Sequence, residues 1–356
     1  MNMKYKAYLC SFLLTFPILG KASVEADSLR QVQISRLQEQ VNWVNPEAIR
    51  AYLDDTKSSL RDKAPVLYQK LEELETLLPL VNRHLSEDTT QQTIAEAEKL
   101  LALKREIILA NPLLDVDKIL IARYRLGNKA RKAMGPSLGT SVANYNSLFS
   151  SRRKGYDAEI SQLSNLRGDI QSKTIYKPKA DVPISDIQLH WDADRLLFSS
   201  LNENRQWQIY EINTDGTGLH QKVVVDEPDL EFCDANYLPD GKVVATCNIG
   251  YNGVPCVHGD DVVANLVSYD PETKNIHRLT FDQDGNWAPI VIPNGRLMYT
   301  RWEYTDLTHY FSRIVMHMNP DGTENKALYG SGSYFPNSTF DMKPLSKYNS
   351  RFVGII

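Results

Sequence analysis

The spacing of hydrophobic positions separates an N-terminal segment, residues 23–110, from the rest of the chain. Apolar residues in this segment recur at steps of three and four, which places them on one face of a helix. The clearest run is Leu67, Leu71, Leu74, Leu78 and Val81. The pattern predicts helices near 28–42, 46–81 and 90–110. We expect a small antiparallel bundle; a coiled coil that binds a partner is the alternative, although clean heptads are few.

From residue 111 to residue 356 the pattern changes to short β-branched and aromatic runs separated by Asp-Gly, Asn-Gly and Pro turns. Such runs are typical of strands joined by tight turns. A basic residue followed by an apolar run occurs four times, at Lys118, Arg195, Lys242 and Arg296. A repeat of about 50 residues with several short strands predicts a β-propeller. A β-sandwich would also have short strands, but not this repeat.

The repeats predict a mainly β fold with an N-terminal helical segment and about four to five propeller blades. A closed propeller of this kind commonly has six to eight blades. The last residues, RFVGII (351–356), form an apolar run with no turn or polar tail after it. We therefore expect an incomplete propeller, and a chain that is a fragment of a longer protein.

The first 22 residues have the pattern of a secretory signal peptide. Lys4 and Lys6 precede an apolar run at 7–19, and Gly20 and Ala22 place small residues at a cleavage site. The run is shorter than the roughly 20 residues that span a bilayer. The pattern predicts cleavage after Ala22, a periplasmic or secreted protein, and no membrane span afterwards. A buried N-terminal helix is the alternative.

Composition and motifs narrow the function. The formal net charge is −4, and no basic stripe with interleaved aromatic residues is present, so no nucleic-acid partner is expected. The sequence contains no nucleophile elbow, phosphate-binding loop or HExxH helix. These observations favour a binding or scaffold module, for a protein partner or a small ligand, with no activity of its own.

The candidate binding residues lie in RWEYTDLTHY (301–310). The segment concentrates Arg301, Trp302, Glu303 and His309 directly after a predicted strand. Propellers bind ligands where loops meet the central channel. Arg301 and Glu303 alternate with Trp302 and therefore share one face of an extended chain. A salt bridge between blades with aromatic packing is the alternative interpretation.

A second candidate is the loop around Cys256, which continues to His258 and Asp261. Cysteine, histidine and aspartate can together hold a metal ion. No further ligand stands at a diagnostic spacing, so we expect a polar loop at the mouth of the propeller and no metal.

The cysteines offer one disulfide. Cys247 and Cys256 flank the turn-rich segment NIGYNGVP, and a disulfide between them would close a short loop. A reactive or metal-binding thiol, or inert buried thiols, are the alternatives. Cys233 has no predicted partner.

Several longer segments carry a family resemblance. They are NPLLDVDKILIAR (111–123), LPDGKVVATCNIGYNGVPC (238–256), LTFDQDGNWAPIVIPNGRLMYTRWEYTD (279–306), MNPDGT (318–323) and YFPNS (334–338). Together they resemble the middle domain of the hydrazine synthase alpha subunit, and the repeat is similar to the TolB-type, or PD40, class of WD40-like propellers. The resemblance implies a periplasmic or exported propeller.

The resemblance also implies an alternative function. In hydrazine synthase the propeller lies beside c-type haem domains, which need Cys-x-x-Cys-His attachment sites. This chain has no such motif, so no covalent haem and no other cofactor is expected in it. The alternative is a subunit or fragment of a hydrazine-synthase-like multihaem oxidoreductase whose haem-bearing part lies on another chain or on a missing domain.

Overall fold

A computed structural model of the chain describes residues 19–87, 90–126, 149, 151–254, 259, 262–283, 285–303, 312–332, 335–336, 338–345 and 350–355. The fold divides into two units. The helical unit is Met1–Asp117 with Asn165–Asp169, and the blade unit is Lys118–Ser164 with Ile170–Ile356. Residues 1–18, most of the predicted signal peptide, lie outside the described residues, so the signal peptide stays a prediction.

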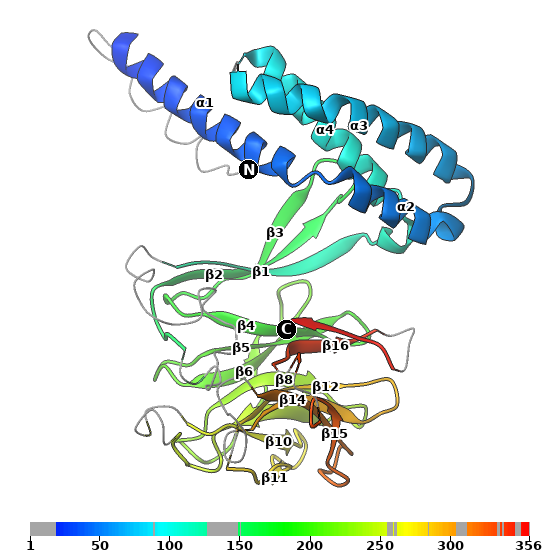
Figure 1. Ribbon diagram of the computed structural model, residues 1–356. Coiled ribbons are helices and arrows are strands. Elements are labelled where there is room, and N and C mark those ends of the chain that lie inside the picture. The colour runs from blue at the N-terminus through cyan, green and yellow to red at the C-terminus, as the bar shows by residue number, and fades with distance from the viewer. Residues whose placement is uncertain are drawn as a thin grey trace. The chain divides into compact units, whose positions relative to one another are not determined.

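The helical unit consists of four α-helices and two short 3-10 helices in the described part of the chain (Figure 1). They are α1 (Leu19–Asn42), α2 (Pro46–Leu60), η2 (Arg61–Lys63), α3 (Ala64–Glu87), α4 (Gln91–Leu109) and η3 (Pro112–Leu114). Asn45 and Thr90 cap α2 and α4 by accepting hydrogen bonds from the backbone N–H groups of Ala48 and Thr93. One apolar cluster, which includes Leu53, joins all four helices.

The prediction of one helix across 46–81 is wrong. The chain leaves the helix at Arg61, which has a positive φ of 50°, and a new helix starts at Ala64. Pro65 lies in the first turn of α3, where a missing N–H costs nothing because that N–H has no partner within the helix. Pro65 indicated the break in the sequence, but the helical spacing of apolar residues continues on both sides of it and predicted one helix.

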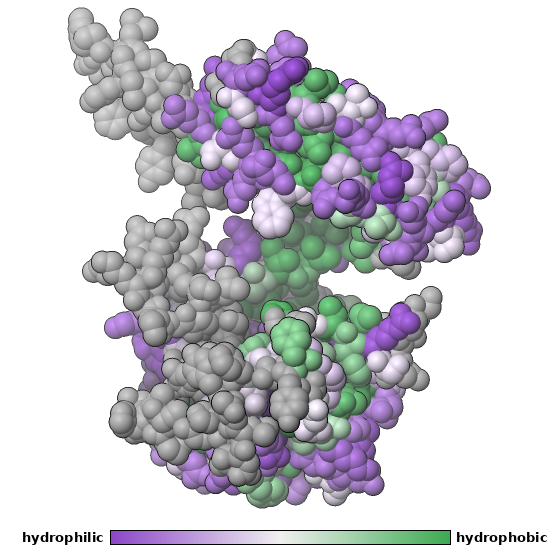
Figure 2. Space-filling view, viewed as in Figure 1, coloured by the Kyte–Doolittle hydropathy of each residue, from purple (hydrophilic) through white to green (hydrophobic). Residues whose placement is uncertain are grey.

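The helical unit presents a largely hydrophilic surface in Figure 2, with hydrophobic residues visible between the helices. Each helix has a polar face, which differs from the uniformly apolar surface of a membrane-spanning helix. Of the helices in the described residues, none combines the length and hydrophobicity that a membrane span needs.

The blade unit contains antiparallel sheets in which neighbouring strands follow one another in sequence. The first sheet has β1 (Lys118–Leu126), β2 (Tyr156–Ser164) and β3 (Gln171–Tyr176), and three four-stranded sheets follow. They are β4 (Ile184–Leu189), β5 (Arg195–Leu201), β6 (Trp207–Asn213) and β7 (His220–Gln221); β8 (Phe232–Tyr237), β9 (Val243–Cys247), β10 (Asn265–Tyr269) and β11 (Ile276–Arg278); and β12 (Asn286–Val291), β13 (Leu297–Trp302), β14 (Arg313–Met318) and β15 (Lys326–Tyr329). A two-stranded sheet, β16 (Phe340–Pro344) and β17 (Phe352–Ile355), ends the unit.

The sheets stack as propeller blades do. The first strands contact each other in succession, β4 with β8, β8 with β12 and β12 with β16. Apolar clusters fill the space between successive sheets. Every residue of β9 is buried, because Val243 and Ala245 face one neighbouring sheet and Val244 faces the other. This confirms the predicted mainly β fold with propeller-like blades; the described residues form no closed ring.

The sequence repeats correspond to particular strands. Arg195 is the first residue of β5, Lys242 and Arg296 directly precede β9 and β13, and Lys118 opens β1. The tight turns before β9 and β13 hold Gly241 at φ 85° and Gly295 at φ 81°, a conformation that favours glycine. The repeats did not reveal the first strand of each four-stranded sheet, β4, β8 and β12, and those strands carry the candidate site. Whether the chain is a fragment stays a prediction.

Candidate functional site

The first strands of four successive sheets share an unusual backbone feature near their start. Asp186, Asp234, Ala288 and Asp341 all have positive φ values, of 53°, 53°, 54° and 47°. Each lies where the pairing with the next strand shifts register. Such a bulge re-aims a side chain, and non-glycine residues in this conformation concentrate at functional sites. Three of the four equivalent positions are aspartates.

Asp186 and Asp234, which we call the aspartate pair, lie together where β4 meets β8. Their carboxyl groups hydrogen bond to each other. Ser185 Oγ donates to Asp186 Oδ1 at 2.9 Å, and Thr246 Oγ1 donates to Asp234 Oδ2 at 3.2 Å. The backbone N–H of Ala288 donates to the same Asp234 oxygen at 3.3 Å. Hydroxyls and backbone groups from three sheets therefore surround two carboxyl groups.

Burial determines the electrostatics of the pair. It raises the pKa of Asp186 well above the usual carboxyl range, and the charge of Asp234 raises it further. Burial also raises the pKa of Asp234, while hydrogen bonds from Asp186 and Ala288 work against this rise. Two carboxyl groups that hydrogen bond to each other need a proton between them, so the pair titrates as one system. Apart from that contact, Asp186 Oδ2 is buried without a partner among the described residues.

The pair lies close to solvent. Asp234 is 7% exposed, Asp186 is partly exposed, and Asp341, whose charge raises the pKa of Asp234, is exposed. Sequence reasoning missed these residues because acidic residues are frequent in every turn of the chain. The usable signal was position: Asp186 and Asp234 stand nine and eight residues before Arg195 and Lys242.

The predicted ligand residues Arg301 and Glu303 do come together. Arg301 Nε lies 2.7 Å from Glu303 Oε1, and Arg301 Nη1 lies 2.9 Å from Asp282 Oδ1. Trp302 is buried, and the Arg313 guanidinium lies 5.3 Å from its ring centre. Arg301 and Glu303 thus form an ion pair at the end of one strand, with Asp282 from the segment before β12, beside an aromatic contact. A ligand role for Arg301 and Glu303 stays a prediction.

Other predicted site residues lie outside the described part of the chain. These are His258, Asp261, His309 and the predicted disulfide partner Cys256. Cys247 and Cys233 are both buried with free thiols. Burial raises the pKa of Cys247 to about 12 and that of Cys233 well above its usual value, which favours the protonated form of both thiols. The Cys247–Cys256 disulfide stays a prediction.

A group of His190, Asp192 and Asp194 offers three metal-ligand atoms in the turn between β4 and β5. Arg195 occupies this group, however, with Nη2 2.6 Å from His190 Nε2 and Nη1 3.0 Å from both Asp194 oxygens. The guanidinium already supplies the positive charge that a metal would bring. The turn is therefore a poor metal centre, whereas the main groups that act on the pKa values of the aspartate pair, among the residues that the structure describes, include no cation.

Comparisons with known proteins identify no family. No protein-family model and no curated protein matches the sequence. Among solved structures, hydrazine synthase from Kuenenia stuttgartiensis is 16% identical with a TM-score of 0.49, covering 64% of this chain and 34% of its own. TolB from Acinetobacter baumannii is 12% identical with a TM-score of 0.42, covering 74% of this chain and 53% of its own. Putative TolB from Agrobacterium tumefaciens is 12% identical with a TM-score of 0.39, covering 66% and 79%.

This chain thus spans about a third of the hydrazine synthase chain and about half of the TolB chain that it resembles. Identities of 12–16% and TM-scores below 0.5 give no basis for transferring an activity, substrate or partner. The propeller-like fold rests on the strand topology of the chain itself.

Proposed function

We propose that the blade unit is a binding module whose ligand or protein partner presents a positively charged group to the aspartate pair. The observation that carries this proposal is the buried, unpartnered oxygen of Asp186 beside a second carboxyl group. The main groups that act on the pKa values of the two aspartates include no cation. An ammonium or guanidinium group would replace the shared proton and supply that charge.

The position of the pair supports the same function. It lies near the start of β4 and β8, and the register pairs Asn286, at the start of β12, with Arg301. The loops that the sequence predicts as ligand-binding therefore follow the same end of the sheets. Propellers present their binding loops at the ends of the blades, around the first strands.

Binding of a polyammonium probe tests this function. We expect spermidine to bind the full chain in calorimetry with an affinity that falls as salt increases, because charges at the site are partly exposed. Binding should release protons, seen as a heat that depends on the ionisation enthalpy of the buffer. Asp186→Asn should weaken binding about tenfold, the loss of one charge-assisted hydrogen bond.

Asp192→Asn is the matched control, because Asp192 is an exposed turn residue near the same strand. It should leave spermidine binding unchanged. Equal affinities in wild type and Asp186→Asn, or no binding by the wild type, would contradict the proposal.

We also propose that the protein is exported. The support is the charged, then apolar, then small-residue order of residues 1–22. N-terminal sequencing of protein recovered from the periplasm or medium should begin at Ser23. Recovery of the uncleaved chain from the cytoplasm alone would refute export without affecting the binding proposal.

A further inference from the structure

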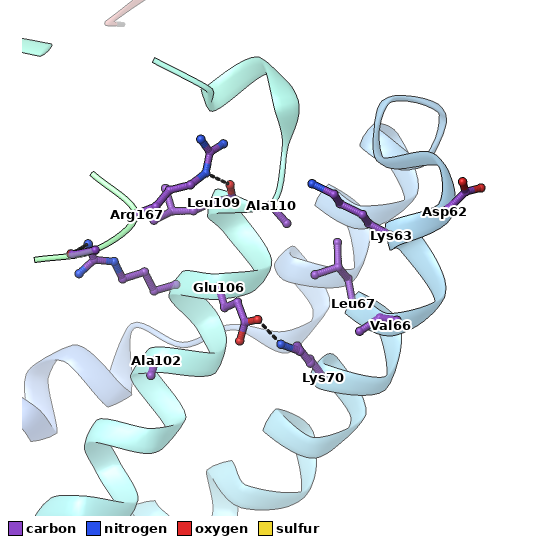
Figure 3. A pocket seen from close by; sticks show the side chains of 12 residues that line it. Asp62, Lys63, Val66, Leu67, Lys70, Ala102, Glu106, Leu109, Ala110 and Arg167 are labelled. Carbon is purple, nitrogen blue, oxygen red and sulfur yellow. Dashed lines mark hydrogen bonds and ion pairs between the residues drawn. The ribbon is translucent and has the colours of Figure 1, made fainter. Parts of the chain in front are cut away.

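A pocket of about 730 Å³, which we call the helical pocket, lies within the helical unit. Residues 62–70 from η2 and α3 form one wall, residues 102–110 from α4 and its C-terminal end form the other, and Arg167 and Gly168 complete the lining. Figure 3 shows the two helices and the side chains between them. The volume falls in the range that binds small molecules, about 300–1,000 Å³.

The walls of the helical pocket are apolar. Leu67 points into it from α3, and Ala102, Leu109 and Ala110 line the opposite wall (Figure 3). Val66, also in the lining, is 52% exposed. An aliphatic side chain left open to solvent beside a cavity favours an apolar ligand, because binding removes its surface from water.

The charges around the pocket do not balance. Lys70 is paired with Glu106, and Arg167 is paired with Asp115. Arg105 donates to the carbonyl oxygens of Leu166 at 2.7 Å and Gly168 at 3.0 Å, so carbonyls rather than a carboxylate meet its charge.

Lys63 makes no ion pair among the described residues. Figure 3 shows its amine reaching across the pocket toward Ala110, while the Asp62 carboxylate points away. Asp62 is the lining carboxylate that has no ion pair among the described residues, and it is directed out of the cavity. Lys63 and Arg105 therefore leave two positive charges that no unpaired carboxylate facing the cavity balances. This arrangement complements a ligand with an apolar body and one negative charge.

We propose that the helical pocket binds a medium-chain fatty acid, with its carboxylate at Lys63 and its alkyl chain between α3 and α4. Each wall extends over about two and a half helical turns, or roughly 12 Å. That length suits an alkyl chain of about ten carbons and is short for a docked peptide helix, which needs anchors over several turns. The site is separate from the aspartate pair, so neither proposal depends on the other.

Calorimetry with decanoate below its micelle concentration tests the proposal on the full chain. We expect saturable binding of one decanoate, and at least about tenfold weaker binding of decan-1-ol, which has the same chain without the charge. Lys63→Gln should weaken decanoate binding about tenfold and leave decan-1-ol unchanged. Lys57→Gln, on α2 and outside the lining, is the matched control and should bind as the wild type does.

Ala102→Phe fills the cavity from an exposed position of α4 and should abolish binding of both compounds. Circular dichroism checks that this variant is folded; if it is not, the Lys63→Gln comparison decides. Absence of decanoate binding, equal binding of decanoate and decan-1-ol, or binding unchanged by Lys63→Gln would each overturn the proposal. Binding of an acidic peptide in place of decanoate would do so as well.

Discussion

Two buried carboxylate sites in the blade unit differ in what surrounds them. Glu211 on β6 is 7% exposed and has cationic partners: Lys222 Nζ lies 3.0 Å away and Arg195 Nε lies 3.9 Å away. Tyr237 Oη, from the next sheet, donates to Glu211 Oε2 at 3.0 Å. Asp234 in the aspartate pair is equally buried, at 7% exposed, but the pair has two hydroxyls, one backbone N–H and its own second carboxyl around it.

The difference distinguishes a carboxylate that stabilises the fold from one that can bind a ligand. Removing one partner of a buried ion pair lowers the stability of the fold, because the remaining charge stays buried without compensation for its desolvation. Glu211 therefore joins β6, β7 and β8 and has little capacity left for a ligand. In the described part of the chain, no cation is among the main groups that act on the aspartate pair, so a ligand can supply that charge. Opposite responses to mutation should distinguish the two sites.

The largest expected effect is at Glu211. Glu211→Ala should lower the free energy of unfolding by about 3 kcal/mol, because Lys222 and Tyr237 lose their common partner in a buried place. Urea denaturation measures the change. Glu203→Ala, in the exposed turn between β5 and β6, is the control and should change stability by no more than about 0.5 kcal/mol. An equally small change for Glu211→Ala would remove the contrast between the two sites.

The next effect has the opposite sign. Asp186→Asn should raise the free energy of unfolding at neutral pH by about 1–2 kcal/mol, because an amide donates to Asp234 without the cost of binding a proton or burying a second charge at that pH. Asparagine also tolerates the positive φ of this position. The same urea titration applies. A loss of stability would place Asp186 among the structural carboxylates with Glu211.

A smaller loss of stability is expected from removing the Tyr237 hydroxyl, which joins two sheets through its hydrogen bond to Glu211. Tyr237→Phe should cost about 1 kcal/mol by removing one hydrogen bond to Glu211 while the ring stays packed. Burial, followed by the charge of Glu211, raises the Tyr237 pKa above its usual value, so the hydroxyl remains a donor at ordinary pH. Thermal unfolding of both proteins measures the difference. If Tyr237→Phe lowers stability as much as Glu211→Ala does, the hydrogen bond from Tyr237 would account for the whole stabilising effect of Glu211.

The smallest expected effect is the change with pH in the stability difference between the wild type and Asp186→Asn. Because the pKa values of the aspartate pair are raised in the folded state, the folded protein binds the proton of the pair more tightly than the unfolded chain does. Its contribution to stability is therefore complete below the ordinary aspartate pKa of 3.8 and is lost as pH rises through the raised value. Stability of the wild type relative to Asp186→Asn should fall as pH increases. A difference that is constant with pH would show that the pair shares no proton.

Part of the architecture could be predicted because it depends on local pattern. The basic residue and apolar run at Arg195 and Lys242 mark strands that every sheet repeats, and the Asp-Gly turn before β9 needs a residue such as Gly241. The first strands were missed because their bulges interrupt the alternation of side chains. Asp186 and Asp234, 48 positions apart in the chain, have nothing local that joins them.

Sequence alone determined the class of each segment: helices where apolar residues recur at three and four, strands where turn residues divide β-branched runs. These follow from backbone geometry, which acts within a few neighbouring residues. Only tertiary structure decided which charges are balanced. Glu211 meets Tyr237, and Asp186 meets Asp234, because successive sheets stack, and burial between sheets sets the energy of a carboxylate. That burial depends on the whole stack of blades and cannot be derived from any one repeat.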